Sequence, residues 1–312
     1  KTVAKPIKWD NFENGSDGAI VAGWDTIIGN NTRYSSANNR VGSKMCYAAK
    51  VTTSDNAYSS NSRISMDGEI LSDKVFASYW IRFNWGQCDG QIKHGLRISN
   101  NYPAVSEPRF DTCVWYSQKN PYWQGANGYL DSRTLWGANN MYPTDVWVQV
   151  EVQAQQSNVN IANGTLMSWV GKASGPMVKV VDRQGNIPMR STDSEWHQAM
   201  LMTWAGNTTN GKTTTIYYDD FYCDNTWARV VIGDSSIYDD CSAREVQIPT
   251  AWNDNSIIVT VNQGAYTSGQ IVYLYVIDAN GNHSNGYQLK IGVNGDMIPP
   301  SSPTGIEATI MQ

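Results

Sequence analysis

The fold class is clearest in the run Val146-Trp147-Val148-Gln149-Val150-Glu151-Val152. Valine occupies every second position of this run, and Trp147, Gln149 and Glu151 occupy the positions between. Successive side chains of a β-strand point to opposite faces of the sheet, so the alternation predicts a strand with one apolar and one polar face. We therefore expect a half-buried strand here, with the valines in a core.

The same alternation recurs along the first two thirds of the chain, in residues 78–83, 199–204 and 215–222. Turn dipeptides such as Asn163-Gly164 and Asn210-Gly211 separate the alternating runs. No window of helical length keeps apolar residues at i, i+3, i+4 and i+7 with caps at both ends. The sequence therefore predicts an all-β protein in which any helix is short.

A second series of strands begins near residue 226. Its apolar runs are residues 229–232, 245–248, 256–261 and 270–277. Short strands at such intervals, separated by Asn- and Gly-rich turns, predict a small second sandwich.

The end of the chain has a different composition. Residues 298–305 contain three prolines and predict a stiff, extended linker, and residues 306–310 then alternate like the first strand of a further sandwich. We therefore divide the chain into four parts. They are an N-terminal extension (residues 1–7), a first sandwich (8–225), a second sandwich (226–295), and a proline-rich linker with a terminal strand (296–312).

Charge excludes two classes of partner. The chain of 312 residues has a net charge of −5 and no block of Lys or Arg, so it lacks the basic surface that nucleic acids and anionic membranes require. No apolar run approaches the ~20 residues of a membrane-spanning helix. Low charge with abundant Asn, Gly, Ser and Thr is typical of secreted β-proteins. We expect an extracellular or cell-surface protein whose signal peptide has been removed.

The cysteines have no metal-site spacing. The five do not form a Cys-x-x-Cys pair, so the sequence gives little support to a zinc site or a thioredoxin-type site. We expect two disulfides and one free thiol. The nearest pairings are Cys88 with Cys113 and Cys223 with Cys241, although spacing alone does not fix the connectivity.

Several motifs of residues 8–224 resemble one known fold family. They include the opening Trp9-Asp10-Asn11-Phe12-Glu13-Asn14-Gly15, the run Tyr79-Trp80-Ile81-Arg82-Phe83, and the turn Gly90-Gln91-Ile92-Lys93-His94-Gly95-Leu96. In these motifs the chain resembles the concanavalin-like jelly roll of glucuronan- and alginate-lyase type polysaccharide lyases and their secreted relatives. Residues 228–292 resemble an immunoglobulin-like domain of the IPT/TIG type. The resemblance implies a jelly-roll sandwich followed by a smaller one.

The resemblance also implies residues for a lyase reaction. Such an enzyme removes the proton α to a uronate carboxylate, and needs a base together with positive or amide groups that neutralise the carboxylate. Gln91, Lys93, His94 and Arg97 carry groups of these types. Strand alternation places Lys93 and His94 on opposite faces, so the two do not line one cleft unless the strand breaks.

An aromatic segment offers a second kind of site. Flat rings suit sugar faces and amides suit sugar hydroxyls, and this segment interleaves both. Its rings are Trp115, Tyr116, Tyr122, Trp123, Tyr129 and Trp136. They bind an uncharged glycan, pack a long loop onto the sandwich, or form an interface with another subunit, and the sequence leaves all three interpretations open.

Three carboxylates suggest a metal site. Glu13, Asp219 and Asp220 come from the first and last strands of the expected jelly roll, which lie near one another, and oxygen ligands suit a structural Ca²⁺. The alternative, which we favour, is that these side chains accept hydrogen bonds from backbone groups or from arginine. We expect no other cofactor.

Two classes of function remain. In the first, the protein is a non-enzymatic structural subunit whose terminal strand, with Ile306, Ala308 and Ile310 on one face, adds to a sheet edge of the next copy and builds a head-to-tail filament. The unpartnered strand favours it, as does the absence of the Tyr-x-Lys-x-Gly-x-Tyr pattern that the resembling lyases carry. The alternative is an extracellular protein that binds a polysaccharide, or a lyase that cleaves uronate-containing glycans.

Overall fold

The computed structural model describes most of the chain. The described residues are 5–29, 31–52, 61–84, 91–100, 109–115, 120–126, 135–136, 140–171, 174–190, 193, 195–206, 213–292 and 307–308. Within these ranges the only helical segment is a short 3₁₀ turn, η2 (Tyr238–Asp240), and no helix long and apolar enough to cross a membrane occurs among them. The all-β prediction is confirmed.

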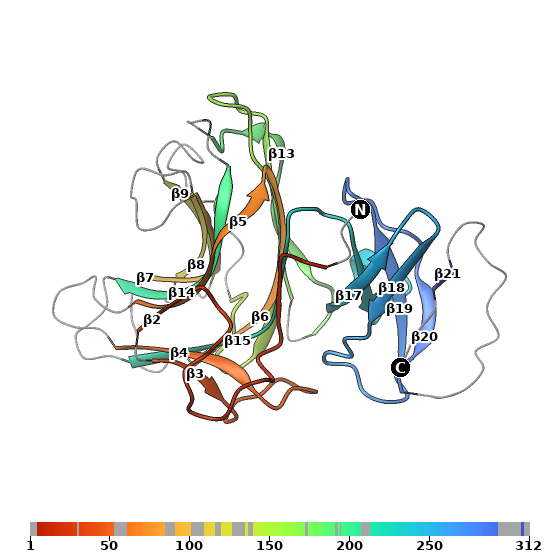
Figure 1. Ribbon diagram of the computed structural model, residues 1–312, viewed down its shortest axis with the longest axis horizontal. Coiled ribbons are helices and arrows are strands. Elements are labelled where there is room, and N and C mark those ends of the chain that lie inside the picture. Colours follow the sequence, from red (N-terminus) through yellow and green to blue (C-terminus); the bar gives the residue numbers. More distant parts are fainter. Residues whose placement is uncertain are drawn as a thin grey trace.

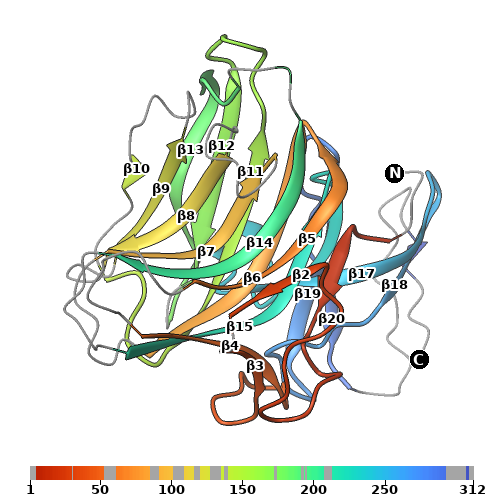
Figure 2. The ribbon, with the colours of Figure 1, turned by 60° about the vertical axis from the view of Figure 1, so that its left-hand side comes forward.

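The first sandwich has two antiparallel sheets, which we name sheet A and sheet B (Figures 1 and 2). Sheet A has the order β13 (Val178–Ile187), β12 (Gly164–Val170), β11 (Trp147–Gln155), β6 (Lys74–Asn84), β15 (Thr213–Asp224), β4 (Cys46–Thr52) and β3 (Thr32–Ser35), and β1 (Lys8–Asp10) pairs with the end of β15. Sheet B has the order β10 (Leu135–Trp136), β9 (Asn120–Ala126), β8 (Arg109–Trp115), β7 (Gln91–Ser99), β14 (Trp196–Gly206), β5 (Asn61–Ser72) and β2 (Thr26–Ile28). This arrangement is the predicted jelly-roll sandwich.

The main hydrophobic core lies between these two sheets. Alternate residues of each strand point into it, as in Val148, Val150 and Val152 of β11 and in Leu96 and Ile98 of β7. The valines of the alternating run therefore take the predicted place.

The other face of β11 is not solvated, and here the prediction of a half-buried strand is wrong. Gln149, Glu151 and Gln153 alternate with the core valines, yet their exposed fractions are 1%, 0% and 3%. The reason is a third sheet, which packs on the outer face of sheet A. The polar alternation therefore marks a contact between units rather than a surface.

The third sheet, which we call the C-terminal unit, follows β15 directly. Its order is β20 (Tyr287–Lys290), β19 (Ile271–Ile277), β16 (Arg229–Gly233), β17 (Arg244–Trp252), β18 (Ser256–Thr260) and β21 (Glu307–Ala308). A small hydrophobic cluster that includes Ile232, Tyr266 and Val272 packs on one face of it. Figure 1 shows the unit lying against sheet A, while sheet B occupies the opposite side of the molecule.

A second hydrophobic cluster joins the C-terminal unit to sheet A. Phe76, Trp169 and Tyr222 of sheet A pack in it with Val231 and Tyr275 of the C-terminal unit. Buried polar contacts surround this cluster. Gln149 donates to the Arg244 carbonyl at 2.6 Å, and the Arg244 guanidinium lies 3.5 Å from Glu151.

The prediction of two disulfides and one free thiol is wrong, because three of the five cysteines are free. Cys223 and Cys241 are both free and buried, with Cys223 in the sandwich core and Cys241 in the cluster between the units, so they do not form a disulfide. Cys46 is also free and buried. Cys88 and the Cys113 side chain lie outside the described part of the chain.

Candidate functional site

The outer face of sheet B is the candidate site. The C-terminal unit packs on part of the outer face of sheet A, whereas sheet B faces away from that unit (Figure 1). On β5, Ile64 and Met66 point into the core, and therefore Arg63, Ser65 and Asp67 belong to the outer face. On β14, Ala199 and Leu201 point into the core, and therefore Gln198, Met200 and Met202 belong to the outer face of the sheet.

Antiparallel pairing aligns these outer residues in a row across the strands. Ser65 pairs with Met200, Met200 pairs with Arg97 of β7, and Arg97 pairs with Asp111 of β8. Arg97 is 4% exposed and Met200 is fully buried, whereas Arg63 and Asp67 are half-buried. Arg97 and Met200 are therefore largely covered, and Arg63 and Asp67 are the more accessible groups of this row and its neighbours.

A second row carries a connected polar network. Ser99 donates to the Gln198 amide oxygen at 2.8 Å, the Gln198 amide nitrogen donates to Asp67, and Thr26 of β2 also donates to Asp67. Partial burial raises the pKa of Asp67, but the hydrogen bonds from Thr26, Gln198 and Ser65 and the charge of Arg63 together hold that pKa below its ordinary value. Asp67 is therefore a fixed anion beside Arg63.

Strand β7 determines where the predicted lyase residues fall. Its pairing with β14 is unbroken, with Arg97 opposite Met200, His94 opposite Thr203 and Lys93 opposite Trp204. By register position, Gln91 and Lys93 fall on the same face of the sheet as Arg97, and His94 falls on the other face. The side chains of Gln91, Lys93 and His94 lie outside the described part of the structure.

Pairing of β7 with β8 is irregular between Ile92 and Arg97, and Gly95 lies at this irregularity with φ of 101°. A Cβ atom at this position would collide with the hydroxyls of Thr112 and Tyr79. Gly95 N donates to the Tyr218 hydroxyl at 3.1 Å, and Leu96 N donates to the Thr112 hydroxyl at 2.8 Å. Side chains from the core thus supply acceptors that the β-ladder does not, and they fix the backbone between Lys93 and Arg97.

The aromatic segment gives a mixed outcome. Trp123 is fully buried in the sandwich core, so of the three interpretations its ring fits packing within the sandwich and fits neither glycan binding nor an interface with another subunit. Successive positions of a strand belong to opposite faces, so residues 121, 123 and 125 of β9 share the core face, and Trp123 is the one aromatic residue among them. Trp115, Tyr122 and Trp136 lie in β8, β9 and β10, but their side chains fall outside the description, as do residues Tyr116 and Tyr129.

The three predicted calcium ligands have protein partners. Arg40 binds Asp219 at 3.7 Å, Asp220, and Glu245 of β17 at 2.6 Å. Asp220 adopts a φ of 46° at a bulge of β15, where an extra residue brings both carboxylates close to Arg40. Burial raises the pKa of Asp219 to about 8, although Arg40 opposes this shift.

Glu13 lies in a separate environment. One carboxylate oxygen accepts hydrogen bonds from the Ser43 hydroxyl at 2.7 Å and from the backbone nitrogens of Lys44 and Met45. Among the described residues, no group of three His, Cys, Asp or Glu side chains is arranged to hold a metal ion. Glu13 thus accepts hydrogen bonds from backbone groups, and Asp219 and Asp220 lie against an arginine. These are the partners that we favoured over calcium from the sequence.

The terminal strand has a partner within its own chain. In β21, Glu307 pairs with Ser256 and Ala308 pairs with Ile257, in parallel with β18. The strand-like segment thus extends the edge of the C-terminal sheet in cis. Ile306 and Ile310 lie outside the described residues.

Sequence analysis missed the residues that surround Arg97. Gln198 precedes residues 199–202, which are all apolar, whereas Arg63 and Asp67 lie in the alternating run of residues 63–67. That alternation identifies which residues face outward. It does not show that β5, β14 and β7 are neighbours, because strand order is a long-range property.

The comparisons with known proteins show likeness of fold at low identity. The sequence matches no protein-family model and no curated protein. Among solved structures, the chain is similar to the PL-14 alginate lyase from Aplysia kurodai, with 12% identity and a TM-score of 0.47 over 64% of this chain and 90% of that one. It is similar to the cellulose induced protein Cip1, with 15% identity and a TM-score of 0.47 over 70% of this chain and 97% of that one.

A third similar structure is the alginate lyase vAL-1 from Chlorella virus, with 12% identity and a TM-score of 0.40 over 65% of this chain and 99% of that one. These likenesses, at low identity, assign neither a family nor an activity to this chain.

Proposed function

We propose that this protein binds an acidic polysaccharide on the outer face of sheet B. The observation that carries the proposal is that two arginines, the half-buried Arg63 and the buried Arg97, lie on the same outward face of sheet B. A guanidinium presents a planar fork of donors that matches a carboxylate, so these groups suit a uronate better than a neutral sugar.

The surrounding groups suit the rest of a sugar chain. Ser99, Gln198 and Thr26 form a hydrogen-bonded network that holds the half-buried Asp67 in place, and the Asp67 carboxylate is an acceptor that suits sugar hydroxyls. Neighbouring strands lie about 4.8 Å apart, so a row across several strands spans the length of several sugar units. The proposed ligand is therefore an extended chain that crosses the strands.

A second candidate function is β-elimination at the same face. It is favoured by the register of β7, in which Lys93 and Arg97 fall on one face. A lysine amine would take the proton from the carbon next to the uronate carboxylate, while Arg97 neutralises the carboxylate as negative charge develops. The electrons of the broken C–H bond form a C=C bond, and the glycosidic oxygen leaves with the electrons of its own bond.

The filament hypothesis stays an untested prediction, and we do not favour it. Its motivation was a strand without a partner, and β21 pairs with β18 of the same chain. The extracellular location and the exclusion of nucleic acid and membrane also stay predictions from composition.

Isothermal titration with full-length protein tests the binding. Polygalacturonate should bind, and its fully methyl-esterified form, which has the same backbone without carboxylates, should bind at least about tenfold more weakly. Arg97→Gln and Arg63→Gln should each reduce polygalacturonate binding, whereas Arg183→Gln on exposed β13 should not. Equal binding of both polymers would refute selectivity for acidic glycans.

Ultraviolet absorbance tests the elimination separately. Incubation with alginate, polyglucuronate or polygalacturonate should produce the absorbance of an unsaturated uronate, and Lys93→Ala should abolish it while binding persists. If binding is measured and no absorbance develops with any of the three polymers, the protein binds without cleaving.

A further inference from the structure

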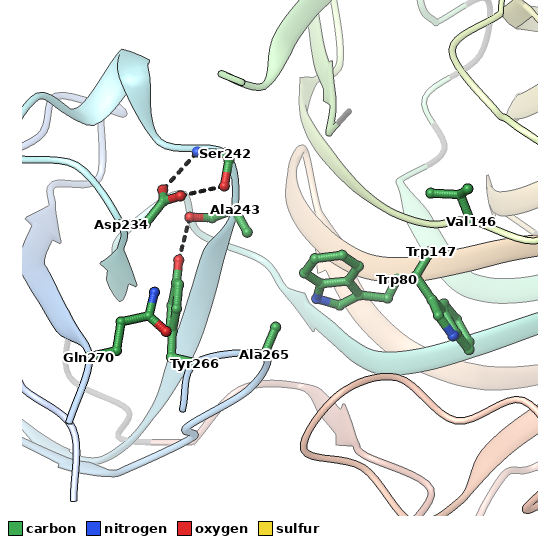
Figure 3. Close-up of a pocket in the computed structure, with 9 residues that line it drawn as sticks. All are labelled: Trp80, Val146, Trp147, Asp234, Ser242, Ala243, Ala265, Tyr266 and Gln270. Atoms are coloured by element: carbon green, nitrogen blue, oxygen red, sulfur yellow. Dashed lines mark hydrogen bonds between the residues drawn. The ribbon is translucent and has the colours of Figure 1, made fainter. Parts of the chain in front are cut away.

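A cleft lies between the sandwich and the C-terminal unit, on the side of the molecule away from sheet B (Figure 3). Its volume is about 340 Å³, at the lower end of the range of small-molecule sites. Trp80, Val146 and Trp147 line the sandwich side, and the other lining residues belong to the C-terminal unit. They are Asp234, Ser242, Ala243, Ala265, Tyr266 and Gln270.

The two tryptophans form the aromatic wall. The Arg40 guanidinium lies over the Trp80 ring, 4.6 Å from its centroid, and the Trp80 indole nitrogen donates to Glu245 at 3.4 Å. The Trp147 indole nitrogen donates to the Asn38 carbonyl at 3.0 Å. Because neighbouring groups already bind the polar edge of each ring, the half-buried surface left toward the cleft is apolar carbon.

The opposite wall carries polar groups held in place. Asp234 accepts hydrogen bonds from the backbone nitrogen and the hydroxyl of Ser242, and the Tyr266 hydroxyl donates to the Ala243 carbonyl at 2.7 Å. The Gln270 amide oxygen accepts from Thr267 N at 3.1 Å, which leaves its amide nitrogen to donate elsewhere. Figure 3 shows Trp80 extending toward Tyr266 and Gln270 across the opening.

The charge of the lining selects the class of ligand. Asp234 is the one acid among the lining residues, and none of them is Lys or Arg. A carboxylate repels anions and accepts hydrogen bonds from hydroxyls, while the Gln270 amide donates to hydroxyl oxygens. The cleft therefore differs in preference from the arginine-bearing face of sheet B.

The two walls are also fixed relative to each other. Arg40 connects Asp220 of β15 to Glu245 of β17, and the Glu245 carboxylate accepts from Ala265 N at 2.9 Å. The cluster of Phe76, Tyr222 and Val231 holds the same pair of sheets together. A ligand would thus meet a preformed site and would not have to order it.

We propose that this cleft is a second glycan site, which takes neutral sugar units by stacking on Trp80 and Trp147 and by hydrogen bonding to Asp234 and Gln270. It is independent of the proposed function of sheet B, because it has other residues, another ligand charge and another face of the molecule. In a polysaccharide with neutral and acidic stretches, the cleft would bind the neutral stretch and the outer face of sheet B the acidic stretch.

Titration of full-length protein with neutral oligosaccharides tests the proposal, with tryptophan fluorescence and calorimetry as readouts. The probes are the tetrasaccharides of β-linked glucose, mannose and xylose and of α-linked glucose. At least one should bind, and Trp147→Ala and Gln270→Ala should each weaken it about tenfold or more. Trp252→Ala, a half-buried tryptophan of β17 outside the cleft, is the matched control and should bind as the wild type does.

Gln270→Ala also separates loss of binding from loss of folding. Its side chain is half-buried, so truncating it leaves no cavity in a hydrophobic core. Arg97→Gln should leave neutral-sugar binding unchanged, which separates this site from sheet B. Failure of every neutral probe to bind at millimolar concentration would overturn the proposal. Binding that survives both Trp147→Ala and Gln270→Ala would overturn it as well.

Discussion

Arg40 is surrounded by more acid than its single charge balances. Asp219, Asp220 and Glu245 all lie within ion-pair distance of it, and all four groups are buried. Burying an ionised carboxylate without full compensation is costly, and binding a proton removes the cost. This explains why Asp219 has a pKa of about 8.

Asp219→Asn should change how stability depends on pH. Folded Asp219 keeps its proton up to about pH 8, whereas the unfolded group releases it near its ordinary pKa of 3.8. Its contribution to stability is therefore complete below about pH 4 and is lost as the pH rises to about 8. Across that window the stability of wild type relative to Asp219→Asn should fall by up to about 1.4 kcal/mol per pH unit, as measured by urea unfolding.

Asp193→Asn is the control for this measurement, because Asp193 is exposed and pairs with Arg190 at the surface. It should keep the wild-type pH dependence. An Asp219→Asn variant with the same pH dependence as wild type would show that Asp219 is already ionised in the folded protein.

Trp123→Ala should act on stability. The side chain is fully buried in the sandwich core, and removing it leaves a large cavity. We expect a loss of about 3–5 kcal/mol in the free energy of unfolding, measured with urea. A loss below about 1 kcal/mol in the free energy of unfolding, together with weaker glycan binding, would indicate that the Trp123 ring lies at the surface and would contradict the structure.

At the level of single residues, the sequence predicts which chemical groups a side chain offers better than it predicts whether that side chain is buried. It identified Arg97 and Lys93 as groups that suit a uronate, and strand alternation separated Lys93 from His94. It did not show that Trp123 is in the core, because an aromatic residue between polar neighbours is equally compatible with a ring on the surface. Which face of β9 is covered depends on the strands packed against it.

Strand β11 shows what the alternation of apolar and polar residues predicts about a strand and what it does not predict. The alternation of residues 146–152 predicted the strand and the face that holds its valines. It failed for Gln149 and Glu151, which are buried against the C-terminal unit. Polar residues at a contact between two units have the same pattern as polar residues in water, and only the position of the second unit distinguishes them.

Strand β21 gives a prediction about assembly. It contributes two paired residues at the edge of β18, and therefore removing residues 298–312 should leave the sandwich and its core intact. The shortened protein should elute from size-exclusion chromatography in the same oligomeric state as the full-length protein. A full-length protein that forms fibres, and a shortened one that does not, would instead support the filament hypothesis.

The sandwich and the C-terminal unit share a hydrophobic cluster, and this governs the behaviour of the whole molecule. Phe76 of β6 packs against Tyr222 with ring centroids 5.9 Å apart and lies under the Arg229 guanidinium at 3.9 Å. Neither unit can unfold without exposing this surface to water. We therefore expect the two units to unfold together.

Phe76→Ala tests this coupling by differential scanning calorimetry. Wild type should show one unfolding transition, and the variant should show one transition at a lower temperature, with a loss of about 3–5 kcal/mol. Two separate transitions in the wild type, with only one of them shifted in the variant, would show that the units are independent.

We place the proposed acidic-glycan site on sheet B, because the C-terminal unit packs on the outer face of sheet A. The decisive measurement is calorimetric titration of full-length protein with polygalacturonate and its methyl ester, for wild type, Arg97→Gln and Arg183→Gln. Binding of the acid form alone, lost in Arg97→Gln and kept in Arg183→Gln, is the predicted result. No binding of the acid form, or equal binding by all three proteins, would contradict the proposal that the outer face of sheet B binds an acidic polysaccharide.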